Sequence, residues 1–574
     1  MMGDETPAIL KAHYTRCQRS DKLMSEKLYG LWKAQVHRIL GIFSIFCPDA
    51  NRLYLDEVVE LTHCEPCRIC RRVPGVFTRV RTLEIARAAS VTRCPSFVFH
   101  FLTLIFLFFL SCGSLQGQVL TARVSVISLA EPARVRVEGS FGSGSVEWSF
   151  RDSYGRINGL GDRIQNLSLA DATGTSIEVR KVASGEFRTN RLATKFTYEV
   201  ILPQPENPLD AAHVSGLTNQ YGYLMLADLL PLLPTPDVRV TIQAPPAWNA
   251  ASSLLLNADG SYHLSDPVNG VFFLAPDLKE KRKRVGAAEF VFVTAGEWPF
   301  GSDAVTKIAA KIIEYHGAHA GFEPKGRVVL MLATLPSSVG ADRWSAETRG
   351  SNLVMLLGRN SRAKSLLGQL SVVLSHELFH VWVPNGLSLD GDYDWFFEGF
   401  TLYQALRCAV RLGFIDFQEY LDTLGRVYDS YLTSGERDRL SLVEASRRRW
   451  TSGGSLVYDK GMLVAFLYDL KLRSSSRNRN SLDDVYRELF RRFPQGAERA
   501  DGNETLISVL ARRDGDETFV SSYIRSPGSI DLETILPVYG IVVTTSGHQR
   551  RLLLADTLNP GQRTLLESLG YRKR

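Results

Sequence analysis

The segment SVVLSHELFHVW, residues 371–382, decides how this chain folds and what it can do. Its apolar residues indicate a buried helix, in which His376 and His380 stand four positions apart. Residues at i and i+4 share one face of a helix, so both imidazoles can reach one metal ion. The alternative is that the two histidines arose by chance in a core or on a surface. However, Glu377 lies between them, and a buried glutamate without a partner is costly. The pattern therefore favours a metal site.

A third ligand is expected from the segment WFFEGF, residues 395–400, because Glu398 begins an apolar stretch that predicts a second helix. Asp390, Asp392 and Asp394 are rivals for this role. They stand among turn residues, where aspartate usually caps or is solvated. A ligand on a helix can be held by packing, which favours Glu398.

The predicted ligand set indicates a particular chemistry. Two histidines and one glutamate, with a fourth position open to water, are typical of a catalytic zinc ion. Zinc lowers the pKa of that water, and Glu377, next to the first histidine, could accept its proton. The residues therefore predict a zinc hydrolase.

Further motifs follow in a fixed order, and together with the first they resemble the M61 glycyl aminopeptidase family of metallopeptidases. This family belongs to the gluzincin group, with thermolysin and the alanyl aminopeptidases. The resemblance covers about residues 290–545 and, more weakly, the β-rich stretch before them. The motifs that carry it are HELFHVW at 376–382, FFEGFTLY at 396–403, SLVEAS at 441–446, VYDKG at 457–461 and SLDDVYRELF at 481–490.

The resemblance implies roles for individual residues. His376, His380 and Glu398 match the zinc ligands, and Glu377 matches the general base. Tyr458 matches a tyrosine that hydrogen-bonds the oxyanion in related gluzincins, and a phenol aimed at developing negative charge stabilises a transition state. The alternative for Tyr458 is a packing role, and Lys460 is expected to be structural. The resemblance also makes aminopeptidase action more expected than internal cleavage.

The chain departs from the family in three places. Val383 follows Trp382, where the family usually has an asparagine soon after the tryptophan. The Gly-rich block before the metal helix matches poorly over residues 340–356, where Glu347 is the candidate for binding a substrate amine. No PDZ domain is expected, because only about 40 residues follow Ile530. The poor match leaves both trimming and internal cleavage open, whereas zinc hydrolysis is still expected.

The fold class expected is multidomain. Alternating segments with turn signals between them predict a β-sandwich-like domain over residues 118–285. Residues 286–530 are expected to form a thermolysin-like α+β zinc peptidase domain with a helical C-terminal half, and 531–574 a short C-terminal segment. An edge strand at 352–357 is expected to pair with extended substrate, as in gluzincins. The basic run at 279–284 is interpreted as a solvated linker, and Arg447, Arg448 and Arg449 as surface residues that could rim the cleft.

Composition bounds the partners. The chain has 574 residues, of which 45% are hydrophobic and 22% charged, as in globular proteins. Its net charge of +6 lies mostly in the first 95 residues. The remainder is nearly neutral, which gives no reason to expect nucleic-acid binding. A peptide or protein substrate is the partner expected, and the oligomeric state is not predicted.

The N-terminal region reads as a targeting segment. Residues 96–110 form an apolar run preceded by arginines and followed by small residues, which indicates a signal peptide or a short membrane anchor within 91–117. Residues 1–90 are then a doubtful extension from a start codon placed too far upstream. Cys112 offers a weak lipoprotein alternative. Cys64, Cys67 and Cys70 are spaced like metal ligands, but no matching fourth cysteine follows.

The sequence therefore predicts an exported zinc-dependent peptidase, periplasmic, secreted or membrane-anchored. The alternative is a catalytically degenerate, zinc-containing protein that binds peptides or a surface.

Overall fold

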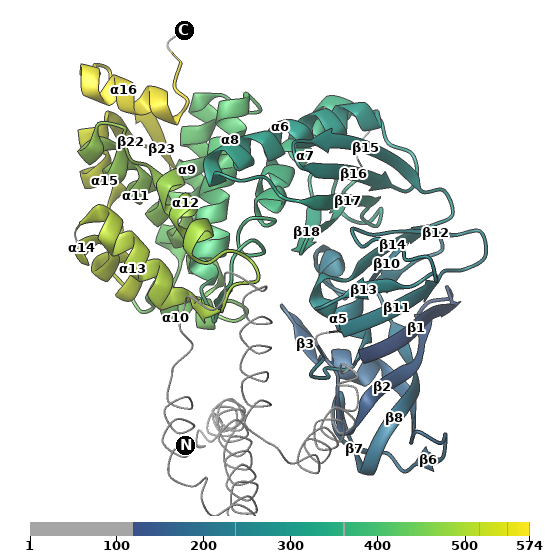
Figure 1. Cartoon of the computed structure of the whole chain (residues 1–574). Coiled ribbons are helices and arrows are strands. Elements are labelled where there is room, and N and C mark those ends of the chain that lie inside the picture. Colours follow the sequence, from purple (N-terminus) through teal and green to yellow (C-terminus); the bar gives the residue numbers. More distant parts are fainter. Residues whose placement is uncertain (1–118, 236, 360–361, 516, 548, 573–574) are drawn as a thin grey trace, which may run out of the picture. The chain divides into compact units, whose positions relative to one another are not determined.

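The computed structural model describes residues 119–572 apart from 236, 360–361, 516 and 548 (Figure 1). The predicted extension at 1–90, the targeting segment and the cysteines before residue 113 lie outside these residues. No described helix combines the length and the hydropathy needed to cross a membrane.

The N-terminal part is a sandwich of two sheets. The larger sheet has the order β13-β11-β1-β2-β8-β5-β6, with β7 paired to β8, and the smaller has the order β12-β14-β10-β9. Alternate residues of β1, such as Leu120, Ala122 and Val124, are buried and pack with Leu224 and Phe272 of the smaller sheet. The strands are Val119–Ser128 (β1), Ala133–Ser149 (β2), Ile164–Ala170 (β5), Ser176–Ile177 (β6), Arg180–Ala183 (β7), Glu186–Leu202 (β8), Gly216–Leu217 (β9), Gly222–Met225 (β10), Asp237–Gln243 (β11), Asn249–Ala251 (β12), Tyr262–Leu264 (β13) and Val271–Ala275 (β14).

A third sheet lies against the smaller one and begins the part of the chain that carries the predicted ligands. Its order is β15-β16-β17-β19-β18, with β18 at one edge. All of β14 is buried, because alternate residues enter the cores on its two sides. The strands of this third sheet are Lys279–Val285 (β15), Ala288–Thr294 (β16), Gly326–Thr334 (β17), Trp344–Arg349 (β18) and Asn352–Leu357 (β19).

This sheet corrects one linker prediction and one edge-strand prediction. The basic run at 279–284 was expected to be a linker, but it forms the exposed edge strand β15, paired antiparallel with β16. Lysine and arginine are common on such edges, where charge discourages association with other strands. The residues 352–357 form β19, which lies between β17 and β18, so the edge next to the metal helix is β18 instead.

Helices cover the other face of the third sheet and make up the C-terminal half (Figure 1). A sheet-rich N-terminal region and a helical C-terminal half were both predicted. The helices are Ser302–Ala320 (α6), Ala363–Phe379 (α7), Thr401–Leu412 (α8), Phe417–Thr433 (α9), Leu442–Arg447 (α10), Gly461–Ser476 (α11), Leu482–Arg492 (α12), Gly502–Asp514 (α13), Glu517–Val520 (α14), Leu532–Ile535 (α15) and Pro560–Leu569 (α16). A hairpin of Ile541–Ser546 (β22) and Gln549–Leu554 (β23) precedes α16.

Candidate metal centre

Helix α7 presents the two histidines as the spacing predicts. His376 lies in the last turn of α7 and His380 directly follows it, and their Nε2 atoms are 3.0 Å apart. His380 Nδ1 lies 2.8 Å from the carbonyl oxygen of Val383. That carbonyl can only accept, so Nδ1 carries the hydrogen and Nε2 keeps its lone pair for a metal.

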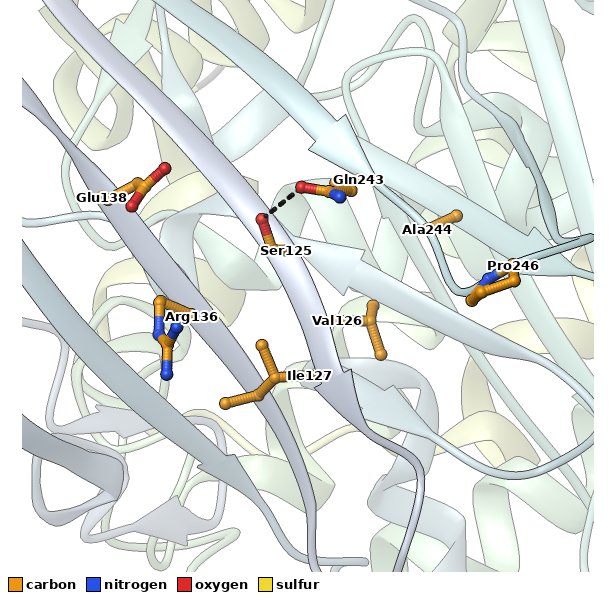
Figure 2. A pocket seen from close by; sticks show the side chains of 8 residues that line it. All are labelled: Ser125, Val126, Ile127, Arg136, Glu138, Gln243, Ala244 and Pro246. Carbon is orange, nitrogen blue, oxygen red and sulfur yellow. Dashed lines mark hydrogen bonds between the residues drawn. The ribbon is translucent and has the colours of Figure 1, made fainter.

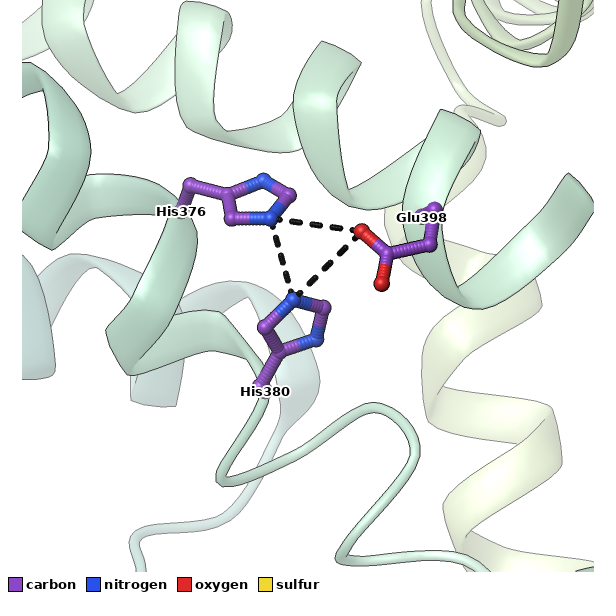
Figure 3. Close-up of side chains that lie close together, drawn as sticks. All are labelled: His376, His380 and Glu398. Carbon is purple, nitrogen blue, oxygen red and sulfur yellow. Dashed lines mark hydrogen bonds and ion pairs between the residues drawn. The ribbon is translucent and has the colours of Figure 1, made fainter. Parts of the chain in front are cut away.

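Glu398 completes the group from a second element (Figure 3). It lies in the π-helical turn Trp395–Phe400 (η5), which runs into α8. Its Oε2 lies 3.4 Å from His376 Nε2 and 3.8 Å from His380 Nε2. Among the described residues, these three form the group whose ligand atoms all lie within 4.8 Å of one another. The rival aspartates are not part of it.

The donor set fits a zinc ion. Two imidazole nitrogens and one carboxylate oxygen converge, and each of these side chains is at most 12% exposed. Imidazole nitrogens are common zinc ligands. Catalytic zinc sites also use a carboxylate oxygen beside two histidines. The tautomer fixed by Val383 leaves the correct nitrogen of His380 for the ion.

Glu377 is held beside this group by the edge strand. It is buried, and Thr348 of β18 donates a 2.7 Å hydrogen bond to its Oε2. The same hydroxyl lies 3.1 Å from the Glu377 backbone oxygen. Thr348 therefore fixes the orientation of the carboxylate with respect to the first histidine.

Arg449 joins the third candidate ligand, Glu398, to Tyr458. Its Nη2 donates to Glu398 Oε1 at 2.7 Å and to the Tyr458 hydroxyl oxygen at 2.6 Å, while Nη1 donates to Asp394 Oδ1 at 2.8 Å. The side chain is 11% exposed, so its interpretation as a surface residue was wrong. Burial, followed by the charge of Glu398, raises the pKa of Tyr458 well above its usual range. The phenol is therefore protonated at neutral pH.

Two glycines bring Glu398 and Tyr458 together. Tyr458 lies in the π-helical turn Leu456–Lys460 (η6), which leads into α11 as η5 leads into α8. A Cβ on Gly399 would lie 2.5 Å from the Cα of Gly461, and one on Gly461 would lie 2.8 Å from the Trp395 carbonyl oxygen. The two turns therefore cross in backbone contact, which explains the glycines in EGF and DKG. π-Helical turns often occur at functional sites.

Lys460 closes η6 with its side chain wholly buried, in keeping with a structural role. Burial lowers its pKa to about 8.

Glu347 is already engaged by three partners. Tyr154, from the short strand Ser153–Tyr154 (β3), donates to its Oε1, and Arg349 Nε lies 3.4 Å from the same oxygen. His213, at the end of the 3₁₀ turn Pro208–His213 (η3), lies with Nδ1 2.6 Å from Oε2. Burial alone would raise the pKa of Glu347, but the His213 hydrogen bond and the Arg349 charge lower it to about 2.

Sequence reasoning missed the N-terminal part of this cluster. No site residue was predicted in the β-rich region, yet it supplies Tyr154 and His213. They stand about 190 and 130 positions before Glu347, so no local spacing could link them. Burial alone would lower the pKa of His213, but the hydrogen bond with Glu347 and the charge of that carboxylate raise it.

A separate depression lies on the larger N-terminal sheet (Figure 2). A 3.0 Å hydrogen bond joins Ser125 to Gln243 across it. None of the predicted site residues lines it, so the metal centre is the site considered below. Its lining residues are Ser125, Val126, Ile127, Arg136, Glu138, Gln243, Ala244 and Pro246.

Comparisons with known proteins support the resemblance drawn from the motifs. The family model for M61 glycyl aminopeptidase matches residues 388–464, which include Glu398 and Tyr458. A search of the curated proteins found no match.

Two solved structures are similar to the chain. An aminopeptidase N family protein from Idiomarina loihiensis aligns with a TM-score of 0.63 and 18% identity, over 74% of this chain and 79% of that one. This likeness shows a shared fold. An M1 zinc metallopeptidase from Deinococcus radiodurans aligns with a TM-score of 0.48 and 16% identity, over 72% of this chain and 95% of that one.

Proposed function

Starting from the match of residues 388–464 to the M61 glycyl aminopeptidase family, we propose that this chain is a zinc-dependent peptidase. The observation that carries the proposal is the convergence of His376, His380 and Glu398 from two separate elements. Chance histidines on a helix would have no reason to meet a buried glutamate from another turn. A thermolysin-like catalytic domain is part of this proposal.

Zinc, when bound, would polarise the scissile carbonyl and lower the pKa of a water molecule. Glu377 would accept the proton of the attacking water and pass it to the leaving amine. Thr348 occupies one oxygen of this carboxylate and leaves the other to take the proton. To act as the base, Glu377 thus needs the orientation in which Thr348 holds Oε2 and Oε1 stays available for the proton.

Tyr458 would donate a hydrogen bond to the oxyanion. Its raised pKa keeps the phenol protonated. Arg449 donates to the phenol oxygen, so the Tyr458 hydrogen is left for another acceptor. A donor fixed in advance toward developing charge costs no reorganisation during the reaction.

The substrate would lie along β18. This strand ends the sheet, and within the described part of the chain no other strand pairs with its outer edge. A peptide can add to such an edge through backbone hydrogen bonds. Because Thr348 of β18 contacts Glu377, a peptide in this position passes the proposed base. Removal of single N-terminal residues is the mode that the family match favours, and internal cleavage is the alternative.

The test is cleavage of a mixed peptide library by the purified full chain loaded with zinc, read by mass spectrometry. Glu377→Gln is the control for the base, and Glu398→Ala should lose zinc. Cleavage that disappears with Glu377→Gln would support the proposal. Bound zinc without cleavage would instead favour the non-catalytic peptide-binding alternative, and no zinc binding would remove both.

We also propose that the enzyme is exported, because the apolar residues 96–110 lie between basic and small residues. The test is the N-terminus of the protein purified from its native cells. An N-terminus well before residue 90 would contradict a misplaced start codon.

A further inference from the structure

The cluster around Glu347 bears on which substrates the proposed peptidase accepts, and this inference rests on the proposed function. A peptidase that selects a free N-terminus needs a carboxylate or similar acceptor for the substrate ammonium. On β18, Glu347 is the acidic residue, one position before the Thr348 that contacts Glu377. The question is whether its carboxylate is free.

Both oxygens of the carboxylate already have protein partners. Oε1 accepts from the Tyr154 hydroxyl and from Arg349 Nε, and Oε2 lies 2.6 Å from His213 Nδ1. The Glu347 side chain is 13% exposed and that of Arg349 is 2% exposed. An incoming ammonium would therefore have to compete with these partners for a carboxylate that the fold already uses, and displacing the buried Arg349 would leave its guanidinium without this acceptor.

The charged groups around Glu347 also disfavour the binding of a substrate ammonium there. Arg349 pairs with Glu347 and its guanidinium lies 4.5 Å from the Tyr154 ring centre, with the guanidinium of Arg151 5.0 Å from the same centre. The two guanidiniums also lie 3.5 Å and 3.8 Å from the buried Asp228, so the charges of Glu347 and Asp228 are already balanced by two cations of the protein, and a substrate ammonium would add an uncompensated positive charge.

The same contacts have another use, because they tie two parts of the chain together. Tyr154 and His213 come from the N-terminal sandwich region, and Arg349 Nη2 also donates to the His213 backbone oxygen at 2.7 Å. On the same strand, the Ser345 hydroxyl donates to the Leu209 carbonyl oxygen at 2.6 Å and accepts from the Ala212 amide. The strand β18 is thus anchored along one face to residues 209–213.

The other acidic groups at the metal centre also have protein hydrogen-bond donors. Asp394 and Glu398 both accept from Arg449, and Glu377 accepts from Thr348. Each of the three thus has a protein partner, and Glu377 and Glu398 also have proposed roles as the base and as a zinc ligand.

We propose that Glu347 anchors β18 to the N-terminal region instead of receiving the substrate α-amine, and that the enzyme cleaves peptides whether or not their N-terminus is free. Its substrate class then includes N-acylated peptides and bonds in the interior of a chain.

The experiment compares matched peptides that differ only in N-terminal acetylation, using the zinc-loaded full chain. We expect kcat/KM values that agree within about tenfold. Loss of an ammonium–carboxylate contact in a desolvated site costs about 100-fold or more. A preference of that size for the free amine would overturn the inference and leave the proposed peptidase standing. Failure to cut either peptide, with zinc bound, would remove the proposed function and this inference with it.

Variants of the cluster give a second test. Glu347→Gln should change kcat/KM for both peptides by the same factor, because the residue acts through the strand. Tyr154→Phe is the matched variant, since it removes one donor to the same carboxylate and keeps the ring. Both should lower the midpoint of thermal unfolding. Overturning results are a Glu347→Gln enzyme that loses about 100-fold on the free-amine peptide alone, or unchanged unfolding in both variants. If Glu347→Gln does not fold, the peptide comparison with the native enzyme and the unfolding midpoint of Tyr154→Phe still test the inference.

Discussion

Arg449 lies 2.7 Å from Glu398, and the hydrogen bond between them orients a carboxylate that also faces two histidines. The guanidinium takes Oε1, which leaves Oε2 on the side of the imidazoles. Groups that orient a metal ligand typically change affinity or activity by 10–100-fold when removed. Arg449 is therefore expected to determine how well the site holds zinc.

Replacing Arg449 by Met keeps most of the packing volume and removes the donors. We expect zinc affinity to fall by about 10–100-fold, because Glu398 loses its orientation. Competition with a chromophoric chelator measures this. Arg448→Met is the matched control, since Arg448 is an exposed neighbour on the same segment. Equal affinities for the two variants would contradict the role given to Arg449.

Tyr458→Phe removes the proposed donor to the oxyanion and keeps the ring. We expect kcat to fall by about 100–1,000-fold, as for loss of one oxyanion donor. Zinc content should be unchanged, because Tyr458 is not a ligand. Steady-state kinetics and metal analysis of the same preparation provide the two readouts. An effect on KM with kcat preserved would mean that Tyr458 positions substrate and does not stabilise the transition state.

The backbone contact between η5 and η6 predicts that Gly399 tolerates no side chain. In Gly399→Ala the new Cβ would meet the Gly461 Cα at 2.5 Å, and neither backbone can yield without separating Glu398 from Tyr458. We expect a loss of about 1–3 kcal/mol or more in the free energy of unfolding. Chemical denaturation measures it.

The matched control for this prediction is Gly368 of α7, where a Cβ would meet nothing within 4 Å. Gly368→Ala is expected to be neutral or to stabilise by up to about 1 kcal/mol, as alanine favours helix. Equal free energies of unfolding for Gly399→Ala and Gly368→Ala would contradict the close backbone contact between η5 and η6.

The sequence allowed the three candidate ligands to be picked out because their arrangement is local. Helical periodicity alone puts His376 and His380 on one face, and an apolar segment with one glutamate supplies Glu398. The same patterns predicted strands first and helices after them. Such features need only residues close in sequence, so periodicity and turn residues suffice.

Long-range contacts were out of reach of that reasoning. Arg449 stands in a run of three arginines, and only the fold shows that it turns inward while Arg448 is exposed. Tyr154 and His213 meet Glu347 because a short strand and a 3₁₀ turn from the N-terminal region pack against β18, which no spacing encodes. The edge strand β15 was missed because five of its seven residues are basic, although charged residues protect exposed edges.

The last prediction concerns acid stability. The folded pKa of Glu347 is about 2, below its ordinary value of 4.5. A carboxyl whose folded pKa is depressed stabilises the fold above its unfolded pKa, and this contribution is lost as pH falls through the folded pKa. The stability that Glu347 adds should thus be complete above about pH 5 and decline toward pH 2. Its size is on the order of 3 kcal/mol.

Glu347→Gln removes this carboxyl, so the difference in unfolding free energy between native protein and variant should shrink from pH 5.5 to pH 2.5. Asp483, whose pKa is also about 2, is present in both proteins and cancels in the difference. Urea denaturation across this range, with zinc removed from both proteins, measures it. A difference that stays constant with pH would show that Glu347 is not held ionised by His213 and Arg349, and would weaken its role as the anchor of β18.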